Sequence, residues 1–349
     1  MTRQYRLLGG TGLRVSRLAL GAMTFGEQRV GSHDWGSDEA TARAVFDRYL
    51  EWGGNFVDTA NNYTGGRSEE LLGRFIAETG SRDRVVLATK FTAPTDQRNP
   101  NLTGNGRKNI MAALEASLRR LGTDYVDLYW LHMWDTLTPV EEVMSTFDTL
   151  VRSGKVRAVG LSNTPAWYLT KAQLIAEHRG WERIAALQLE YSLAQRAIER
   201  EHLPAALNLG MGIVPWSPLA HGFLTGKYSR DDAGPSGEGR IGALRELEFY
   251  QAPGEREWTV LDAVRDIAKE IERTPAQVAL NWVANRPGVA STLVGARTQA
   301  QLAENLAALD FELTDEQTAR LTELSEFDHG YPYSMFGWMS RASEYTVST

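Results

Sequence analysis

The sequence predicts an α/β fold, a (β/α)8 TIM barrel with a long insertion between its seventh and eighth strands. Three observations support this prediction: eight short apolar runs, segments with helical spacing between them, and a chain of 349 residues. Alternating strands and helices imply parallel strands joined by right-handed crossovers. Eight such steps of roughly 30 residues fill ~250 residues, the usual size of a closed barrel, whereas an open doubly wound sheet needs fewer strands. We expect one domain over residues 1–349, since we find neither a linker nor a block of like charges.

The eight predicted strands are runs of β-branched residues or leucine. They span residues 18–20, 55–58, 85–90, 126–132, 156–161, 186–189, 212–216 and 291–295. Helical spacing lies between them, as in Ile110, Leu114, Leu118 and Leu121. About 75 residues separate the last two strands. This insertion contains a polar stretch at 229–239 and two further helical patterns, at 259–271 and 275–285.

Two predicted helices carry recognisable start signals. Thr138-Pro139 with Glu141, and Thr274-Pro275 with Gln277, each combine an N-cap residue, a proline in the first turn and a capping-box side chain. We therefore expect helices to begin directly after Thr138 and Thr274.

Composition excludes several classes of protein. The net charge is −7, the wrong sign for holding a nucleic-acid backbone, and the absence of cysteine excludes disulfides, thiolate nucleophiles and zinc-thiolate sites. The six histidines show no metal-ligand spacing, so we expect no metal. The first twenty residues have no apolar core of signal-peptide length and no segment approaches ~18 apolar residues. We expect a cytoplasmic protein that acts on a small molecule, with its oligomeric state left open.

Four polar side chains fall at or just after the ends of three successive strands. Asp58, Lys90 and His132 end the second, third and fourth strands, and Tyr63 follows Asp58 in the next loop. In a barrel these strand ends meet at one rim, where active sites lie. A tyrosine hydroxyl ordinarily ionises near pH ~10, so it acts as an acid only beside a cation such as Lys90, with Asp58 as the counter-charge. His132 would orient a substrate carbonyl.

Each of these residues also has an ordinary structural interpretation. Asp58 could cap a helix, Lys90 could extend to solvent, and Tyr63 and His132 could pack in the core. A tyrosine acid over a carbonyl also needs a second group that delivers electrons or a nucleophile, and the residues alone do not identify it. No nucleophile elbow is present. Gly10-Thr11-Gly12 and Gly104-Asn105-Gly106 both lack the third glycine of a dinucleotide fingerprint. Hydride from a nicotinamide is the natural remaining choice. The residues themselves thus predict a barrel enzyme with a tyrosine acid.

Eight segments, in order, resemble the aldo-keto reductase superfamily over roughly residues 5–324. They are GLRVSRLALGAMTFG, GNFVDTANNY, GRSEELLG, VVLATK, SLRRLGTDYVDLYWLH, GKVRAVGLSN, VPWSPLAHGFLTGKY and LVGARTQAQLAEN. The branch most similar holds aryl-alcohol dehydrogenase-like reductases and potassium channel β-subunits, and the run GNGRKNIMAALEASLRRL is typical of the former. The resemblance implies an oxidoreductase that uses NADPH, without a Rossmann domain, to reduce aldehydes and ketones. It matches Asp58, Tyr63, Lys90 and His132 to the family's catalytic tetrad, with Tyr63 as the acid.

The resemblance also implies where the cofactor would bind. It assigns Ser162, Asn163, Gln188 and Trp216 to the nicotinamide end; Ser217, Leu219, Gly222 and Lys227 to the pyrophosphate; and Gly295, Arg297, Gln301, Glu304 and Asn305 to the adenosine end. Met23 is expected both among the cofactor contacts and in the substrate pocket. Some branches carry a lysine where this chain has Gly295, and Arg297 is then the residue expected to meet the 2′-phosphate. Arg240, in the insertion, would clamp the cofactor. Trp216 also fits core packing, and Thr298 with Gln301 also forms a capping box.

The expected substrate pocket is aromatic. Phe25, Trp134 and Trp338 would form its walls, and the C-terminal segment, residues 331–338, would fold over the barrel mouth or else pack on the exterior. Aromatic walls favour an aryl or bulky carbonyl. Two other functions stay open: an NADPH-binding regulatory subunit with incidental turnover, and a reductase of keto-sugars or deoxysugar nucleotides.

Overall fold

The predicted barrel is present, with all eight strands in the predicted order. The computed structural model describes residues 5–30, 33–96, 98–230 and 252–336. One sheet holds eight strands, each parallel to its neighbour. They are β3 (Leu18–Gly21), β6 (Phe56–Asp58), β7 (Val86–Phe91), β8 (Val126–Leu131), β9 (Val156–Ser162), β10 (Ile184–Glu190), β11 (Gly212–Trp216) and β12 (Thr292–Val294). Backbone hydrogen bonds of Ile213 with Gly288 and Ala290, both 2.8 Å, draw the two edges together into a barrel.

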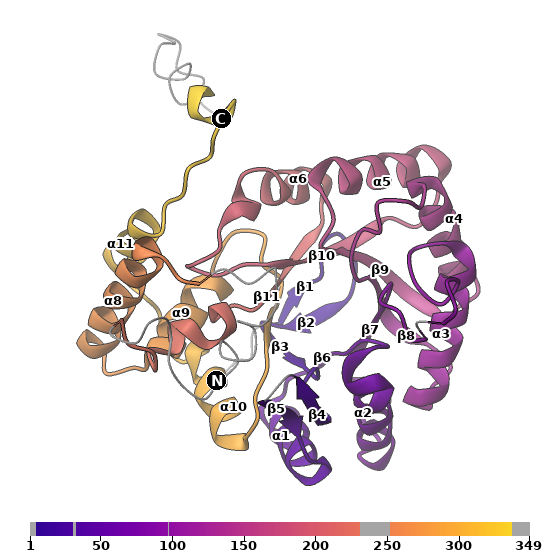
Figure 1. Cartoon of the computed structure of the whole chain (residues 1–349), viewed down its shortest axis with the longest axis horizontal. Helices are drawn as coiled ribbons and strands as arrows, with labels where there is room; N and C mark the ends of the chain where they lie inside the picture. The colour runs from indigo at the N-terminus through magenta and orange to yellow at the C-terminus, as the bar shows by residue number, and fades with distance from the viewer. Residues whose placement is uncertain (1–4, 31–32, 97, 231–251, 337–349) are drawn as a thin grey trace.

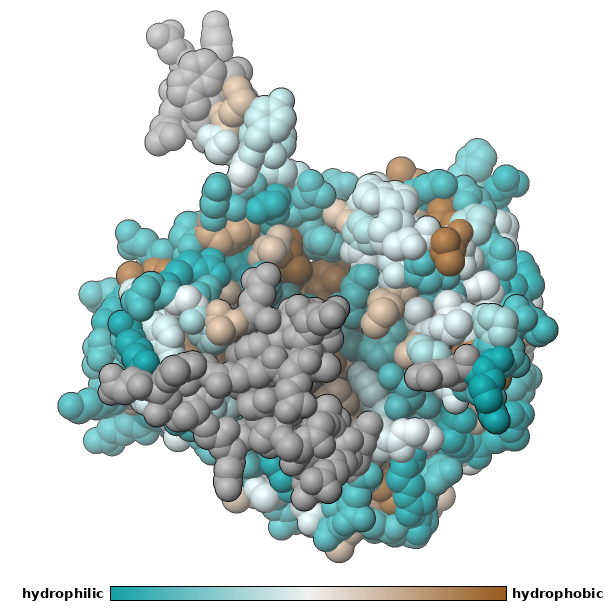
Figure 2. All heavy atoms as spheres, in the orientation of Figure 1, coloured by the Kyte–Doolittle hydropathy of each residue, from teal (hydrophilic) through white to brown (hydrophobic). Residues whose placement is uncertain are grey.

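Helices surround the strands as a ring, which Figure 1 shows from indigo α1 round to orange α10. The ring contains α1 (Glu39–Trp52), α2 (Arg67–Glu78), α3 (Arg107–Leu121), α4 (Val140–Arg152), α5 (Ala166–Arg179), α6 (His202–Leu209), α9 (Pro275–Ala284) and α10 (Gln299–Leu306). Two more helices, α8 (Glu255–Glu270) and α11 (Asp315–Leu324), lie outside α9. The helices of the ring bury apolar residues against the barrel, while hydrophilic residues cover most of the outer face seen in Figure 2.

The two predicted helix starts had different outcomes. The capping box of Thr274 with Gln277 is confirmed, with hydrogen bonds of 3.3 Å and 3.1 Å between the two residues. The Thr138 prediction was wrong by one residue, because α4 begins at Val140 with Pro139 at the N-cap. The Thr138 hydroxyl instead donates to Asp135 (2.6 Å), which also accepts the Thr138 backbone N–H (2.9 Å). This local Asx-type turn competes with the helix for the threonine side chain.

Two antiparallel hairpins were not predicted. The first, β1 (Tyr5–Leu7) with β2 (Arg14–Ser16), brings Leu8 and Val15 into the barrel interior, where both are fully buried. Its turn begins at Gly9, with φ 57°, where a Cβ atom would lie 2.2 Å from the carbonyl oxygen of Ala185. The hairpin therefore closes the end of the barrel opposite the strand C-termini. The second hairpin, β4 (Gly26–Val30) with β5 (His33–Ser37), lies in the loop after β3.

The barrel interior is filled mostly by small inward-facing residues. Ala19, Ala88, Ala158 and Ala186 are all at least 98% buried there, and they surround one very large side chain, Trp130 of β8. Small residues at alternating positions of neighbouring strands leave room for this indole at the centre of the barrel.

The insertion between β11 and β12 is confirmed and contributes the 3-10 segment η4 (Ala220–Thr225), α8 and α9. Most of its predicted polar stretch lies outside the described residues. Shorter 3-10 segments occur elsewhere, at η1 (Tyr63–Gly66), η2 (Arg82–Arg84), η3 (Ala197–Glu199) and η5 (Ala307–Leu309).

The C-terminal segment leaves the barrel body instead of covering the mouth. Its described part, up to residue 336, projects outward in Figure 1, and Tyr331 is 85% exposed. The expectation of a segment over the mouth was therefore wrong for residues 331–336, and Trp338 lies outside the described residues. Tyr333 donates to Glu201 (2.7 Å) and Arg200 donates to the Asp328 carbonyl (2.8 Å), so the segment runs past the outer edge of the barrel near α6.

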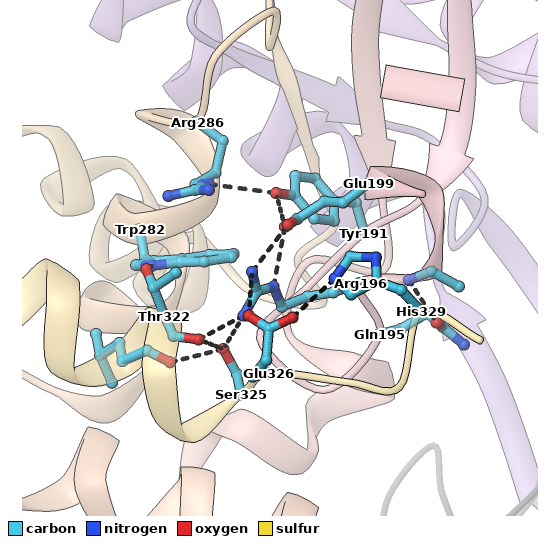
Figure 3. A network of polar contacts seen from close by, with 12 residues as sticks. Tyr191, Gln195, Arg196, Glu199, Trp282, Arg286, Thr322, Ser325, Glu326 and His329 are labelled. Carbon is cyan, nitrogen blue, oxygen red and sulfur yellow. Dashed lines mark hydrogen bonds and ion pairs between the residues drawn. The ribbon is translucent and has the colours of Figure 1, made fainter. Parts of the chain in front are cut away.

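A buried network, the Arg196 cluster, holds the base of this segment (Figure 3). The guanidinium of Arg196 is bidentate to Glu199, at 2.9 and 2.8 Å, and also donates to the Thr322 carbonyl and the Ser325 hydroxyl at 2.5 and 2.9 Å. Tyr191 donates to Glu199 at 2.5 Å. This cluster of Tyr191, Arg196, Glu199, Thr322 and Ser325 fixes the loop after β10 to the end of α11, which directs the chain away from the mouth.

Candidate active site

The four predicted catalytic side chains meet at one end of the barrel. Asp58 ends β6, Lys90 is the penultimate residue of β7, His132 follows β8, and Tyr63 begins the 3-10 turn η1 after β6. Parallel strands place their carboxyl ends at the same rim, as the prediction assumed. The Tyr63 and His132 rings lie edge to face, with centroids 5.8 Å apart.

Lys90 is the centre of the site. Its Nζ donates to Asp58 Oδ1, to the Thr59 carbonyl at 2.9 Å and to the Tyr63 hydroxyl at 3.3 Å. These three contacts use all three N–H groups of an ammonium. The Tyr63 oxygen accepts from Lys90, so its own proton is free to be donated to another molecule. Tyr63 is only half-buried and provides the route from this buried pair to the rim.

Both charges of the pair are removed from water, since the Lys90 side chain is 0% and the Asp58 side chain 2% exposed. Burial by itself lowers the pKa of Lys90, but the charge of Asp58 and the oxygen of Tyr63 outweigh it and raise that pKa above its usual value of 10.5. Lys90 therefore stays protonated beside the tyrosine oxygen, where a cation stabilises the phenolate that forms when Tyr63 gives up its proton.

His132 is neutral. Burial, and secondarily the charge of Lys90, lower its pKa from 6.5 to about 3. Its backbone N–H hydrogen-bonds the Phe91 carbonyl (3.3 Å) and the Thr92 hydroxyl (3.2 Å), which fixes the residue at the rim. Its Nδ1 is buried without a hydrogen-bond partner in the described part of the chain. A neutral imidazole beside Tyr63 can hydrogen-bond a substrate oxygen and does not compete as a cation with Lys90.

Two further donors lie on the far side of Asp58. Trp130 Nε1 and Gln188 Nε2 both donate to Asp58 Oδ2, at 2.9 and 3.0 Å. We call Asp58, Tyr63, Lys90, Trp130 and Gln188 the Lys90 cluster. Trp130 was missed by the sequence analysis, although the strand alternation in YVDLYWLH puts it on the same inward face as the strand's other barrel-filling residue, Leu128.

Beside this cluster, the residues assigned to the nicotinamide end form a connected strip. Asn163 donates to the His132 carbonyl (3.0 Å) and to the Ser162 hydroxyl (3.1 Å), and accepts from Trp216 Nε1 (3.1 Å). Asn163 has φ 49°, a left-handed conformation that asparagine tolerates better than most residues. Trp216 is half-buried, so it is not simply core packing. Met23 is half-buried in the loop after β3.

The residues assigned to the pyrophosphate lie in and around η4. The Ser217 hydroxyl accepts a hydrogen bond from the His221 backbone N–H (2.9 Å) and forms a second hydrogen bond with His221 Nδ1 (3.1 Å). These bonds stabilise a turn in which both residues have positive φ. Leu219 and Gly222 follow in this turn, and Gly222 has φ 92°. Lys227 lies beside it: burial and the nearby charge of Arg297 lower the pKa of Lys227.

Lys227 and Arg297 are thus two cations close enough for the charge of Arg297 to act on Lys227. Among the described residues neither has a carboxylate within ion-pair distance. Two neighbouring cations without a protein counter-charge suit a ligand that carries phosphate groups. The position is open, since a Cβ atom at Gly295 would meet nothing within 4 Å.

The remaining residues assigned to the adenosine end have structural contacts as well. Gln301 accepts from the Arg297 backbone N–H (2.9 Å), and its own backbone N–H donates to the Thr298 hydroxyl (3.1 Å). Thr298 is therefore the N-cap of α10, but the predicted capping box is incomplete, because the Gln301 side chain accepts from Arg297 and not from Thr298. Asn305 is buried and donates to the Gly295 carbonyl (3.3 Å). The carbonyl of Glu304 accepts from Gln277 (3.2 Å). Arg240 lies outside the described residues.

The predicted substrate wall needs correction. Phe25 is fully buried and its ring packs against Phe75, 6.2 Å between centroids, so it belongs to the apolar core. Its side chain belongs to the apolar cluster between the barrel and the helices, together with Phe46 of α1 and Phe75 of α2. Trp134 is half-buried and stacks edge to face with Trp167, 5.4 Å between centroids. This places Trp134 at the outer part of the rim.

A groove of about 1190 Å³ lies elsewhere, between α5 and α6. Its lining includes Trp167, Leu174, Ala205 and, from the C-terminal segment, His329 and Tyr333. None of the residues of the Lys90 cluster lines it, so this groove is separate from the candidate active site.

Two searches confined to the described residues gave negative results. Within those ranges, no three or more His, Asp or Glu side chains are grouped so that they could hold a metal ion. None of the described helices combines the length and the apolar character needed to cross a membrane.

Comparison with known proteins links this geometry to one family. Residues 17–326 match the model of the aldo/keto reductase family. The chain is 38% identical to the uncharacterized oxidoreductase YrpG of Bacillus subtilis, covering 96% of this chain and 100% of that protein. It is 36% identical to norsolorinic acid reductase stcV of Emericella nidulans (92% and 81% covered). It is 33% identical to the aryl-alcohol dehydrogenase [NADP(+)] of Phanerodontia chrysosporium (96% and 89% covered).

Proposed function

The chain belongs to the aldo/keto reductase family, and from that premise we propose that it reduces an aryl aldehyde or ketone to the alcohol with NADPH as cofactor. The observation that carries the proposal is the chain of contacts Asp58, Lys90, Tyr63, which leads from a buried ion pair to a half-buried phenol at the barrel rim. All three ammonium protons of Lys90 are used in hydrogen bonds, whereas the phenol proton of Tyr63 remains available. Tyr63 is therefore the residue of this series that can give a proton to another molecule.

In this mechanism Tyr63 gives its proton to the carbonyl oxygen of the substrate. Lys90 stabilises the phenolate left behind, and Asp58 keeps Lys90 charged. His132, neutral beside the phenol, donates a hydrogen bond to the same oxygen and so fixes the carbonyl within reach of the acid. NADPH, when bound, supplies the hydride that the carbonyl carbon needs.

The rim residues fit a dinucleotide with an additional phosphate. Asn163 and Gln188 would hold the carboxamide: the Nε2 of Gln188 is used by Asp58, which leaves its Oε1 for an amide N–H. The half-buried Trp216 offers a flat wall for the nicotinamide ring, and Lys227 would hold the pyrophosphate. Arg297 would bind the 2′-phosphate, since an arginine fork suits that group. The relative named as NADP(+)-dependent supports this choice of cofactor.

Aromatic side chains support an aryl substrate. Tyr63, Trp134 and Trp216 stand around the rim, and stacking on such rings adds to simple burial. One relative is named as an aryl-alcohol dehydrogenase and another as a reductase of norsolorinic acid. Both names fit reduction of a carbonyl carried by a bulky molecule.

The decisive experiment compares the native chain with Tyr63→Phe in the NADPH-dependent reduction of para-nitrobenzaldehyde, followed by loss of the reduced-nicotinamide absorbance. Removing one hydroxyl keeps the ring and its contacts but deletes the acid, so we expect kcat to fall by about 10²- to 10⁴-fold with little change in cofactor affinity. NADH in place of NADPH should raise the cofactor KM. Equal rates for the two proteins would refute the proposed role of Tyr63.

A negative result with the native chain has its own meaning. If no aryl carbonyl is turned over but keto-sugars are, the reaction class stands and the aryl assignment is wrong. If NADPH binds tightly and no carbonyl in a broad panel is reduced, the chain is a cofactor-binding protein without a reductase function.

A further inference from the structure

Trp130 occupies a position that the barrel reserves for it. On β8 it lies opposite Lys90 of β7 and Gly160 of β9. A Cβ atom at Gly160 would lie 2.2 Å from the indole ring, so any other residue there would displace the tryptophan. Together with the alanines around it, this glycine makes the centre of the barrel a pocket for one indole.

The polar end of that indole has a single partner. Trp130 is fully buried, and its Nε1–H donates to Asp58 Oδ2 at 2.9 Å. Gln188 donates to the same oxygen at 3.0 Å, while Lys90 faces the other oxygen, Oδ1. The two oxygens of Asp58 are therefore divided: one takes two neutral donors and the other takes the ammonium.

The two neutral donors are not equivalent. Gln188 stands at the rim and is assigned to the cofactor as well, so its carboxamide serves two partners. Trp130 lies deeper and cannot titrate, and among the described residues its N–H donates to Asp58 alone. A donor of this kind holds the carboxylate in one orientation whether or not a cofactor is bound, because a hydrogen bond to a charged group is stronger than one between neutral groups.

We propose that Trp130 is a positioning residue for the reduction, whose indole N–H holds the Asp58 carboxylate with Oδ1 directed at Lys90 and thereby holds the ammonium of Lys90 beneath Tyr63. Because it concerns the support of the tyrosine acid, this inference rests on the function proposed above. Trp130 touches neither substrate nor cofactor in this scheme and acts through Asp58.

The test compares Trp130→Phe with Trp282→Phe as a matched control. Trp282 is also buried, and its indole N–H also donates to one side-chain oxygen, Thr322 Oγ1 at 3.1 Å, but in the outer helix layer. For each protein, kcat and KM for the aldehyde are measured with NADPH saturating, together with Kd for NADPH and Tm.

In Trp130→Phe, Asp58 Oδ2 loses one of its two donors, so the carboxylate can turn away from Lys90 and the ammonium is held less well beneath Tyr63. We expect kcat to fall by about tenfold, the order expected for a lost hydrogen bond to a charged group, while KM for the aldehyde and Kd for NADPH stay near the native values. Trp282→Phe should lower Tm without changing kcat. A Trp130→Phe protein with a lower Tm and a native kcat would show that Trp130 only fills space and would overturn the inference.

If Trp130→Phe folds poorly, the role of the Trp130 N–H can be tested with a replacement that conserves the shape of the side chain. A tryptophan analogue with sulfur in place of the ring N–H, incorporated at position 130 alone, removes the donor and retains the packing. It should show the same fall in kcat with a Tm near that of the native protein; a native kcat would overturn the inference. Failure of the proposed function is recognised separately, because then the native chain and Tyr63→Phe do not differ.

Discussion

The Lys90 cluster and the Arg196 cluster are both built on a buried ion pair, but only the Lys90 cluster connects its ion pair to a side chain with an available proton at the barrel rim. In the Lys90 cluster the cation donates to Tyr63, and the phenol is half-buried with its own proton still available. In the Arg196 cluster the cation donates to Glu199, to the Thr322 carbonyl and to the Ser325 hydroxyl. Tyr191 in that cluster also spends its proton on Glu199, at 2.5 Å.

The difference teaches how to separate a chemical site from a structural one. Both clusters contain a tyrosine, a carboxylate and a buried cation, so residue types do not distinguish them. What distinguishes them is where the hydrogen bonds end. Those of the Lys90 cluster end on an acid at the rim, whereas those of the Arg196 cluster end on the loop after β10 and on α11 (Figure 3). The first arrangement can pass a proton and the second ties segments together.

The largest expected effect is a loss of carbonyl reduction when the ion pair of the Lys90 cluster is removed. The double variant Asp58→Asn, Lys90→Met removes both buried charges together and leaves no unpaired ion, so the free energy of unfolding should be unchanged or higher. Carbonyl reduction should nevertheless fall by about 10³-fold, because the phenolate loses its cation. Steady-state rates and urea denaturation of the same preparation measure the two quantities.

The single variant Lys90→Met is the control for this experiment. It leaves Asp58 buried without its cation, so the free energy of unfolding should fall by about 3–5 kcal/mol. Its activity should fall as in the double variant. If the double variant keeps native activity, the Lys90 cluster is structural and the contrast with the Arg196 cluster disappears.

The sequence was sufficient for the barrel and for the residues gathered at its mouth. Strand order and the meeting of strand ends follow from alternating apolar runs, so Asp58, Lys90 and His132 could be placed together without a structure. Trp130 was missed because an apolar run such as YVDLYWLH does not show which tryptophan finds a polar partner across the barrel.

The Arg196 cluster could not be predicted from the sequence, for a different reason. Its contacts join a loop to a helix that follows 126 to 129 residues later, and no periodic pattern links such positions. The same gap explains the error over the C-terminal segment, whose direction is set by this cluster. The short hairpins β1–β2 and β4–β5 were also missed, since strands of three to five residues give little alternation.

The second prediction concerns the Arg196 cluster. Arg196→Met leaves Glu199 without its bidentate partner and should lower the free energy of unfolding by about 3–5 kcal/mol. Rates of carbonyl reduction at a temperature where the variant is folded should equal those of the native chain, since no contact of the cluster reaches Lys90. A loss of activity in the folded variant would mean that the two clusters are coupled.

This destabilisation should depend on pH in a defined direction. In the folded protein burial raises the pKa of Glu199, but the hydrogen bonds from Arg196 and Tyr191 outweigh it and hold the pKa below its usual 4.5. The stability contributed by the ionised form is therefore present above that value and is lost as the pH falls through the lower, folded-state pKa. The difference between native and Arg196→Met should accordingly shrink on acidification. A difference that stays constant would assign the effect to packing of the guanidinium on Trp282 instead.

The smallest expected effect leaves both clusters intact and sharpens the role of the open rim beside the Lys90 cluster. Gly295 has space for a side chain, and its neighbour Arg297 already repels Lys227. In Gly295→Lys a third cation would meet the 2′-phosphate, so the preference for NADPH over NADH should rise by about two- to fivefold, the worth of a solvent-exposed ion pair. Arg297→Met is the opposing control and should lower the same ratio. Because exposed charges are screened, both changes should weaken at high ionic strength. If Arg297→Met leaves the ratio of kcat/KM values untouched while Gly295→Lys raises it, then the phosphate lies nearer β12 than the arginine, and Arg297 serves only the start of α10.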